Sequence, residues 1–108
     1  MASSESFIQY VCEQIEGVGH IRYKKMFGEY MIYIKHKPII IVCDDTPYVK
    51  MHEAISPWMK DASTGYPYPN AKMHYILDVE SQTQAKEIIN ILETHTPIPK
   101  KKVKTSTS

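Results

Sequence analysis

The residues that could perform chemistry in this chain are its histidines, its cysteines and one pair of adjacent carboxylates. His52 and Glu53 begin the H-E-x-x-H pattern of zinc proteases, but Ser56 replaces the second histidine, so the second metal ligand is missing. The 5 histidines show no metal-site spacing with cysteines or carboxylates, and the 2 cysteines form no C-x-x-C pair. Glycine-rich phosphate-binding patterns are also missing. We therefore expect neither a metal nor a cofactor.

The remaining reactive groups are the Asp44-Asp45 pair and the two thiols. The aspartates could supply a general base, but between an apolar run and a Thr-Pro dipeptide they are more typical of a turn. Cys43 ends that apolar run, and Cys12 lies on the apolar side of a predicted helix. Burial raises the pKa of a thiol and suppresses its reactivity, so we expect both cysteines to be unreactive.

Cations and aromatic rings are interleaved from Arg22 to Phe27, in the order R-Y-K-K-M-F. Such a segment could stack against a nucleic acid strand and neutralise it. If the segment is a β-strand, its period of two places Arg22 and Lys24 on one face and Lys25 on the other, core-facing side, unless a bulge at Phe27-Gly28 turns Lys25. A cation buried there needs an acidic partner, such as Glu29 or the Asp pair.

Apolar spacing predicts the elements that position these residues. Helical spacing predicts a first helix that ends before Gly17, with Ser3 or Ser4 as its N-cap. Ser56 and a following proline predict the start of a second helix ending near Gly65. Ser81 and Gln84 stand in capping-box relation at the start of a last helix. Strands are predicted at 21–26, 29–34, 38–43, 48–51 and 72–79, and the continuous apolar run at 38–43 predicts coverage on nearly both faces.

These elements predict an α+β fold of two layers. We expect an antiparallel sheet of four to five strands with three helices, in the order α-β-β-β-(β)-α-β-α, because the connections in the first half are too short for parallel crossovers. The single domain is expected at residues 1–99, followed by a basic, Ser/Thr-rich disordered tail at 100–108.

Composition and charge set the function classes. The chain has 108 residues, of which 43% are hydrophobic and 23% charged, which excludes a disordered chain, a collagen and a coiled coil. Four of the 13 basic residues lie in the tail, so the body of the domain has nine basic residues and 12 acidic ones. Its net charge is therefore negative, and it has no general attraction for nucleic acid. The longest apolar run is too short to span a bilayer, and the start MASSESF resembles no signal peptide. We expect a cytoplasmic protein without membrane association.

The stretch from Gly19 to Tyr33, G-H-I-R-Y-K-K-M-F-G-E-Y-M-I-Y, resembles the signature of the TfoX/Sxy N-terminal domain family, approximately G-x-V-R-x-R/K-K-M-F-G-G-Y-G-I-Y. The family's D-D-x-x-Y-x-K is matched by Asp44, Asp45, Tyr48 and Lys50. The similarity extends from Met1 to about Leu92 and is most specific at K-M-F-G-E-Y.

The resemblance implies a bacterial protein with an antiparallel sheet, flanking helices and no established catalysis or cofactor. Longer members regulate natural competence, act with a cyclic-AMP receptor protein on promoters, and carry a C-terminal domain; this chain resembles the stand-alone N-terminal version. Glu29 and Met31 replace two family glycines, which puts in doubt any function that needs close backbone approach there.

We therefore predict a non-enzymatic regulatory or protein-interaction module. The expected interaction surface comprises Arg22, Lys24, Lys25, Phe27, Tyr30, Asp45, Tyr48 and Lys50. The three aromatic rings of this set could equally pack in the core or at a sheet edge. One alternative is a nucleic-acid-binding co-regulator that uses Arg22, Lys24 and the tail lysines; another is an enzyme with a dispersed site, for instance Asp45, Lys50 or His74. Open strand edges make a homodimer a further possibility.

Overall fold

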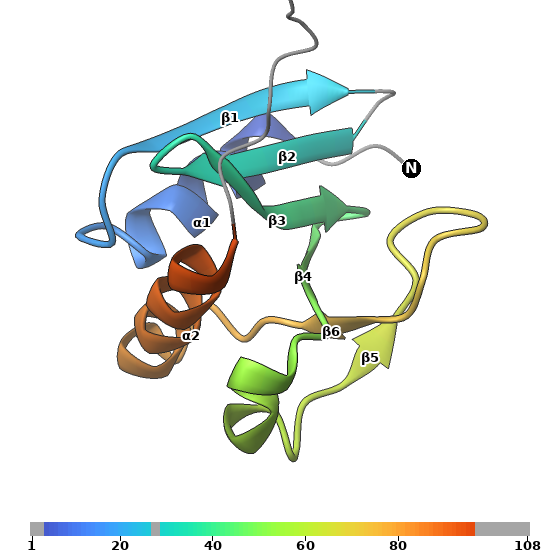
Figure 1. Ribbon diagram of the computed structural model, residues 1–108. Coiled ribbons are helices and arrows are strands. Elements are labelled where there is room, and N and C mark those ends of the chain that lie inside the picture. Colours follow the sequence, from blue (N-terminus) through green and yellow to red (C-terminus); the bar gives the residue numbers. More distant parts are fainter. Residues whose placement is uncertain (1–3, 27–28, 97–108) are drawn as a thin grey trace, which may run out of the picture.

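A six-stranded antiparallel sheet in the order β1-β2-β3-β4-β6-β5 runs through the molecule (Figure 1). The computed structural model describes residues 4–26 and 29–96. The helices are α1 (Glu5–Gln14), the 3-10 helix η1 (Glu53–Trp58) and α2 (Gln82–His95). The strands are β1 (Ile21–Met26), β2 (Glu29–Ile34), β3 (Lys37–Cys43), β4 (Thr46–Lys50), β5 (Thr64–Gly65) and β6 (His74–Ile76). The predicted α+β antiparallel class is confirmed.

The first helix forms where its apolar spacing predicts. The Ser4 side chain accepts a hydrogen bond from the Phe7 N–H, which caps the start of α1, and Glu5 lies in the first turn, where the helix dipole favours a negative charge. Ile8 and Val11 are fully buried against the sheet. The loop after α1 then reverses the chain through Gly17 and Gly19, whose φ angles of 106° and 129° strongly favour glycine.

Two tight hairpins fix the register of the central strands. Lys35 and His36 connect β2 to β3, and Asp44 and Asp45 connect β3 to β4. All four residues have positive φ angles, between 51° and 71°. Two-residue hairpins with this backbone match the twist of the flanking strands. The Asp pair is therefore a turn, as its sequence context predicts.

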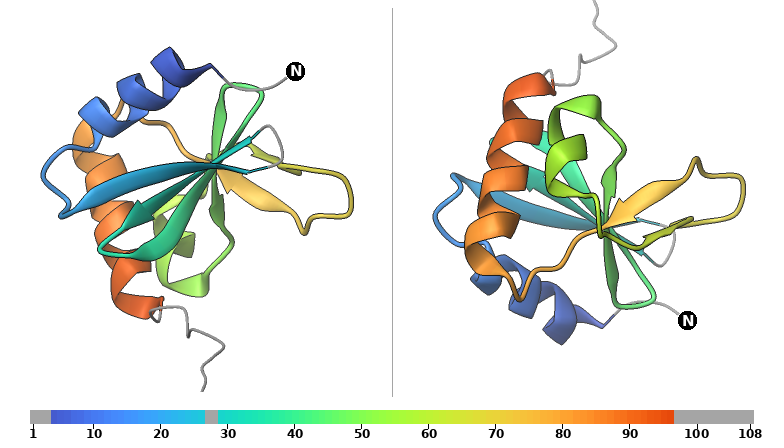
Figure 2. Two further views of the ribbon diagram at one scale, coloured as in Figure 1. Left: turned by 90° about the horizontal axis from the view of Figure 1, so that it is seen from above. Right: turned by 90° about the horizontal axis from the view of Figure 1, so that it is seen from below.

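All three helices pack on one face of the sheet, where the buried residues form a single cluster. The sheet contributes alternate residues of its central strands, and α2 contributes an apolar stripe. Figure 1 shows α1 behind β1 and β2, and Figure 2 shows that the strands twist, so that β4 crosses the direction of β1. The central-strand and α2 members of the core are Tyr30, Ile32, Ile34, Ile39, Ile40, Val42, Val49, Ala85, Ile88, Ile89 and Leu92.

Several local predictions were wrong in detail. The sheet gains a sixth strand because Thr64–Gly65 pairs with His74–Ile76. The second helix is a short 3-10 helix that begins before Ser56, because the His52 side chain accepts a hydrogen bond from the Ala54 N–H and caps it. Ser81 makes no side-chain cap for α2; its hydroxyl donates to Asp78 instead.

The start of the tail and the domain boundary at residue 99 lie outside the described residues, so these stay predictions.

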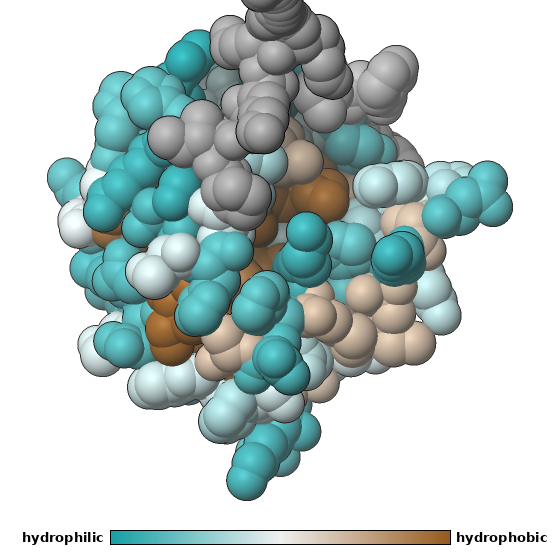
Figure 3. Space-filling model, viewed as in Figure 1, coloured by the Kyte–Doolittle hydropathy of each residue, from teal (hydrophilic) through white to brown (hydrophobic). Residues whose placement is uncertain are grey.

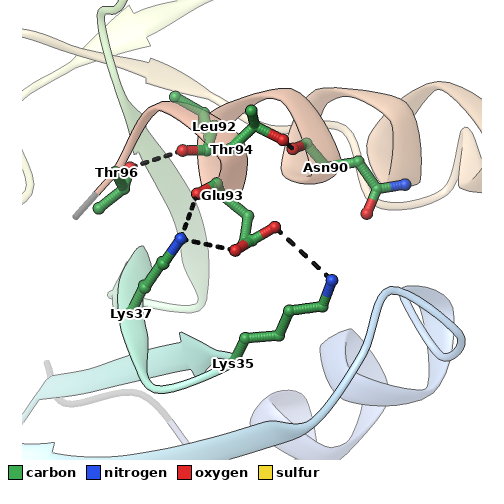
Figure 4. A network of polar contacts seen from close by, with 7 residues as sticks. All are labelled: Lys35, Lys37, Asn90, Leu92, Glu93, Thr94 and Thr96. Atoms are coloured by element: carbon green, nitrogen blue, oxygen red, sulfur yellow. Dashed lines mark hydrogen bonds and ion pairs between the residues drawn. The ribbon is translucent and has the colours of Figure 1, made fainter. Parts of the chain in front are cut away.

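The C-terminal end of α2 is fastened to the β2–β3 hairpin. Lys37 donates hydrogen bonds to the carbonyl and the carboxylate of Glu93, and Lys35 lies 3.7 Å from the same carboxylate (Figure 4). Thr96 donates to the Leu92 carbonyl and closes the last turn. These contacts fix the position of α2 relative to the sheet.

Candidate interaction surface on the uncovered sheet face

The helices of the described chain leave most of the second face of the sheet open, although the last turn of α2 reaches its border. We call it the uncovered face. Its side chains are the alternate residues that point away from the core, and they are half-buried or exposed. Figure 3 looks toward this side and shows apolar surface bordered by polar side chains. Its members are Arg22, Lys24, Met31, Tyr33, Ile41, Tyr48, Lys50, His74 and Ile76.

The strand register aligns five of these residues in one row across the sheet. Lys24 lies opposite Met31, Met31 opposite Ile41, Ile41 opposite Tyr48, and Tyr48 opposite Ile76. Neighbouring strands lie about 4.8 Å apart, so the row is roughly 19 Å long. A cation therefore stands at one end of a continuous apolar row.

Cations surround this row although the described chain is negative overall. Arg22 and Lys24 are exposed at one side of the face, and Lys50 is exposed at the other, beside His74. Among the described strands, the acidic residue on the uncovered face is Glu29 of β2. The exposed acids of the helices and their connections are Glu5, Glu13, Glu16, Glu53, Asp61, Asp78, Glu80 and Glu87. Three cations, Arg22, Lys24 and Lys50, thus lie on the uncovered face, whereas most of the exposed acids lie on the helices and their connections.

Four residues of the predicted interaction surface, Arg22, Lys24, Tyr48 and Lys50, lie on the uncovered face. Of the other four, Lys25, Tyr30 and Asp45 lie elsewhere, and Phe27 falls outside the described ranges.

Lys25 and Tyr30 are opposite one another on the core side of the sheet. Tyr30 is only 8% exposed and its ring packs edge-on against Tyr23, with ring centroids 5.9 Å apart, so it belongs to the core. Lys25 remains exposed on that side and needs no buried partner. Phe27 lies outside the described residues.

Asp45 has a structural task at the β3–β4 turn. Its carboxylate accepts a hydrogen bond from the Ser4 N–H at 3.0 Å, which joins the start of α1 to the hairpin. Lys50 and His74 are neighbours in the register, but Asp45 precedes β4 and Lys50 ends it. A strand rises about 3.3 Å per residue, so Asp45 and Lys50 lie roughly 16 Å apart along the chain. The three residues of the hypothetical dispersed enzyme site do not converge.

The apolar centre of the uncovered face was missed from the sequence. The sequence marks Met31 as a departure from the family glycine and Ile41 as part of the run 38–43. The prediction that this run is covered on nearly both faces is wrong, because Ile41 and Cys43 are half-exposed while Ile40 and Val42 are fully buried. In β2 the isoleucines Ile32 and Ile34 alternate with Met31 and Tyr33, and this alternation is the signal in the sequence for one open face.

Both thiols have a raised pKa, the direction that the sequence predicts. The pKa of the Cys43 thiol is raised to about 11, chiefly by burial, with the neighbouring Glu29 carboxylate acting in the same direction through a hydrogen bond and its negative charge. Burial also raises the pKa of Cys12. A thiol with a pKa near 11 is almost entirely protonated at neutral pH and is a poor nucleophile.

Among the hollows lined by described residues, two differ clearly in size. The larger, of about 980 Å³, opens on the helical side between η1 and α2, with Trp58, Met59 and Ile88 in its wall. The smaller, of about 180 Å³, lies on the uncovered face, where Met31 and Ile41 meet the last turn of α2. Within residues 4–26 and 29–96, no three His, Cys, Asp or Glu side chains gather closely enough to hold a metal ion. None of the helices in these ranges is long and apolar enough to cross a bilayer.

The loop between β5 and β6 is a separate exposed feature. It projects away from the sheet (Figure 2) and carries Tyr66 and Tyr68, which are 61% and 50% exposed. Pro67 between them is buried and anchors the base of the loop.

Fold and surface together define a class of protein: an α+β domain whose helices cover one face of an antiparallel sheet and leave the other face apolar and bordered by cations. The chain belongs to the TfoX N-terminal domain family, whose model matches residues 13–89. The chain is also similar to the "Uncharacterized 12.7 kDa protein in trpE 5'region" of Spirochaeta aurantia. The two are 30% identical over 110 residues, which cover 99% of this chain and 96% of that protein. The resemblance inferred from the K-M-F-G-E-Y motif is confirmed.

Proposed function

We propose that this domain is a regulatory protein-interaction module of the bacterial competence-regulator type, which binds an acidic partner protein through the uncovered face. The observation that carries the proposal is the row Met31–Ile41–Tyr48–Ile76, half-exposed and flanked by Arg22, Lys24 and Lys50. Stable interfaces combine an apolar centre with a polar or charged rim. The cations of this rim favour a partner of negative charge.

Membership of the TfoX N-terminal domain family supports a regulatory role, and it supports a protein such as a transcription factor as the partner. The two cysteines are free thiols, which suits a reducing compartment, and we propose a cytoplasmic location.

Site-specific photocrosslinking tests the face directly. A photoreactive benzoyl-phenylalanine replaces Tyr33 on the uncovered face, and in a matched control it replaces Tyr10 on α1, which is 36% exposed on the helical side. Both proteins are irradiated in lysate of the source bacterium. We expect one acidic protein to crosslink at position 33 and not at position 10. Equal crosslinking at both positions, or none at position 33, contradicts the proposal.

Charge reversal supplies the second test, with the partner identified by crosslinking. Arg22→Glu with Lys24→Glu changes the rim of the uncovered face, whereas Lys60→Glu with Lys86→Glu makes the same change in net charge on the helical side. Since rim charges steer association, the first pair should lower the association rate by about tenfold at low salt and the second should not. Similar losses in both pairs indicate a general charge effect and argue against this face.

Nucleic acid binding is the second candidate, because Tyr33 and Tyr48 lie on the same face as Arg22, Lys24 and Lys50. A single strand could stack on the rings while the cations neutralise its phosphates. A titration of a fluorescent single-stranded oligonucleotide distinguishes the two candidates. A steep decrease of log affinity with log salt, reduced in the Arg22→Glu and Lys24→Glu variant, favours nucleic acid. If the fluorescence does not change when the protein is added at low salt, the oligonucleotide does not bind, and this result favours the protein partner.

A further inference from the structure

Strand β1 forms one outer edge of the sheet and is six residues long. One side of β1 is paired with β2, and no strand of the described chain pairs with its other side. The opposite edge of the sheet is the two-residue strand β5. An unpaired edge of six residues can accept an added strand from another chain.

The β1–β2 register identifies the backbone groups at the free edge. The Lys35 N–H donates to the His20 C=O at 2.8 Å, which makes His20 and Lys35 a hydrogen-bonded pair at the end of the ladder. Such pairs alternate along an antiparallel ladder. Arg22 and Lys24 therefore direct their backbone groups toward β2, whereas the N–H and C=O groups of Ile21, Tyr23 and Lys25 point to the free edge.

We infer that the β1 edge binds an extended acidic segment of the partner protein as a seventh strand, with acidic residues at alternate positions and an apolar residue between them. The inference rests on the proposed function and names the chemistry of the partner. Arg22 and Lys24 are two residues apart on the uncovered face, so two acids at positions i and i+2 of an added strand lie beside them. The residue between those acids faces the core side, next to Ile21 and Tyr23.

Charge disfavours a second copy of β1 as the occupant. An antiparallel pairing of two β1 strands centred on Tyr23 places Arg22 of each copy opposite Lys24 of the other. Like charges directly opposite one another destabilise a sheet. The same cations that disfavour self-association favour an acidic strand. On the core side, the Tyr23 hydroxyl donates to Glu5 at 2.9 Å, which holds the ring against α1 and keeps the edge accessible.

Three fluorescent peptides test the inference with the full chain. The first, Ser-Glu-Val-Glu-Val-Glu-Ser, alternates acids and apolar residues. The second has the same composition with its acids contiguous. The third carries N-methyl groups on its valine amides, which would otherwise donate to the backbone of Ile21, Tyr23 or Lys25. We expect the alternating peptide to bind at least about tenfold more tightly than either control, since both controls lose edge hydrogen bonds or register.

Amide hydrogen exchange locates the peptide. Binding should protect the N–H groups of Ile21, Tyr23 and Lys25, while those of Arg22 and Lys24 already bond to β2 and should change little. Equal affinity for all three peptides, or protection absent from β1, overturns the inference. If the inference fails in this way while crosslinking at position 33 persists, the proposed function stands without the edge.

Two variants at one position separate charge from backbone. Lys25→Ala removes the cation. Lys25→Pro removes the cation and also the backbone N–H that points to the free edge; because this N–H does not bond to β2, the pairing of β1 with β2 is kept. Lys25→Pro should lower the affinity several-fold below that of Lys25→Ala. Equal affinities argue against strand addition, as does a homodimer of the native chain that Lys25→Pro dissociates.

Discussion

Lys37 of β3 binds both polar groups of Glu93 at the end of α2. Its Nζ atom donates to the Glu93 carbonyl oxygen at 2.8 Å and to the carboxylate Oε2 at 2.7 Å. The side chains of Lys37 and Glu93 are only 16% and 14% exposed. A cation at the C-terminus of a helix also interacts favourably with the helix dipole. One partly buried lysine thus donates a hydrogen bond to a carbonyl group in the last turn of α2 and attaches the helix to the sheet.

Replacing the carboxylate should weaken this attachment measurably. Glu93→Gln keeps the size of the side chain but leaves the Lys37 ammonium without a counter-charge. We expect the free energy of unfolding in urea to fall by about 1–2 kcal/mol, between the values for exposed and fully buried pairs. Glu87→Gln, at an exposed position of the same helix, should change it by less than about 0.5 kcal/mol. Equal effects of the two substitutions contradict a special role for Glu93.

The same pair makes stability depend on pH in the acid range. The hydrogen bond from Lys37 lowers the pKa of the Glu93 carboxyl below its ordinary value of 4.5, with Lys35 acting in the same direction and burial opposing both. A carboxyl with a lowered folded-state pKa stabilises the protein above its unfolded pKa, and this stabilisation is lost as the pH falls through the folded value. The difference in stability between the native chain and Glu93→Gln should therefore be full at about pH 6 and shrink below about pH 4.5. A constant difference across urea titrations in this range would contradict the pKa direction.

The β2–β3 hairpin offers a stabilising substitution. His36 has a φ of 71°, a left-handed conformation that disfavours residues with a Cβ by about 1–2 kcal/mol. Glycine removes that strain but adds entropy to the unfolded chain, so His36→Gly should raise the free energy of unfolding by roughly 0.5–1 kcal/mol. His36→Ala keeps the Cβ and should give no gain, so a gain of the same size with alanine would show that strain is not the cause.

The reactivity of Cys43 should depend on Glu29. The hydrogen bond with the Glu29 carboxylate and its charge both raise the pKa of the Cys43 thiol, so Glu29→Gln should lower that pKa. In a Cys12→Ser background, alkylation by iodoacetamide at about pH 8 should then become several-fold faster, because more of the thiol is ionised. Unfolding in urea must remain cooperative in both proteins. An unchanged rate would show that burial alone controls this thiol.

Much of the fold could be predicted from local patterns. The helical spacing around Ile8 and Ile88, the Asp44-Asp45 turn and the strands on either side of it are confirmed. These features depend on neighbours in the chain. The 3-10 helix capped by His52 and the added strand at Thr64–Gly65 were missed, because they depend on a side-chain cap and on pairing with a distant strand.

The candidate surface could likewise be predicted only in part from the sequence. The sequence supplied Arg22, Lys24, Tyr48 and Lys50 from the basic segment and the family motif. It could not distinguish them from Tyr30, which is buried. Alternation assigns residues to two faces of a strand but does not tell which face the helices will cover.

By itself, the sequence determined the family, the antiparallel α+β class, the Asp44-Asp45 turn and the raised pKa of the thiols, because each follows from residue types and spacing within a short segment. Only the tertiary structure decided that Lys24, Met31, Ile41, Tyr48 and Ile76 form one row, and that Lys37 meets Glu93. The residues of that row belong to five strands and come together through the order of the sheet. Which face stays open depends on the helices packing together over the other one, a property of the whole chain rather than of any segment.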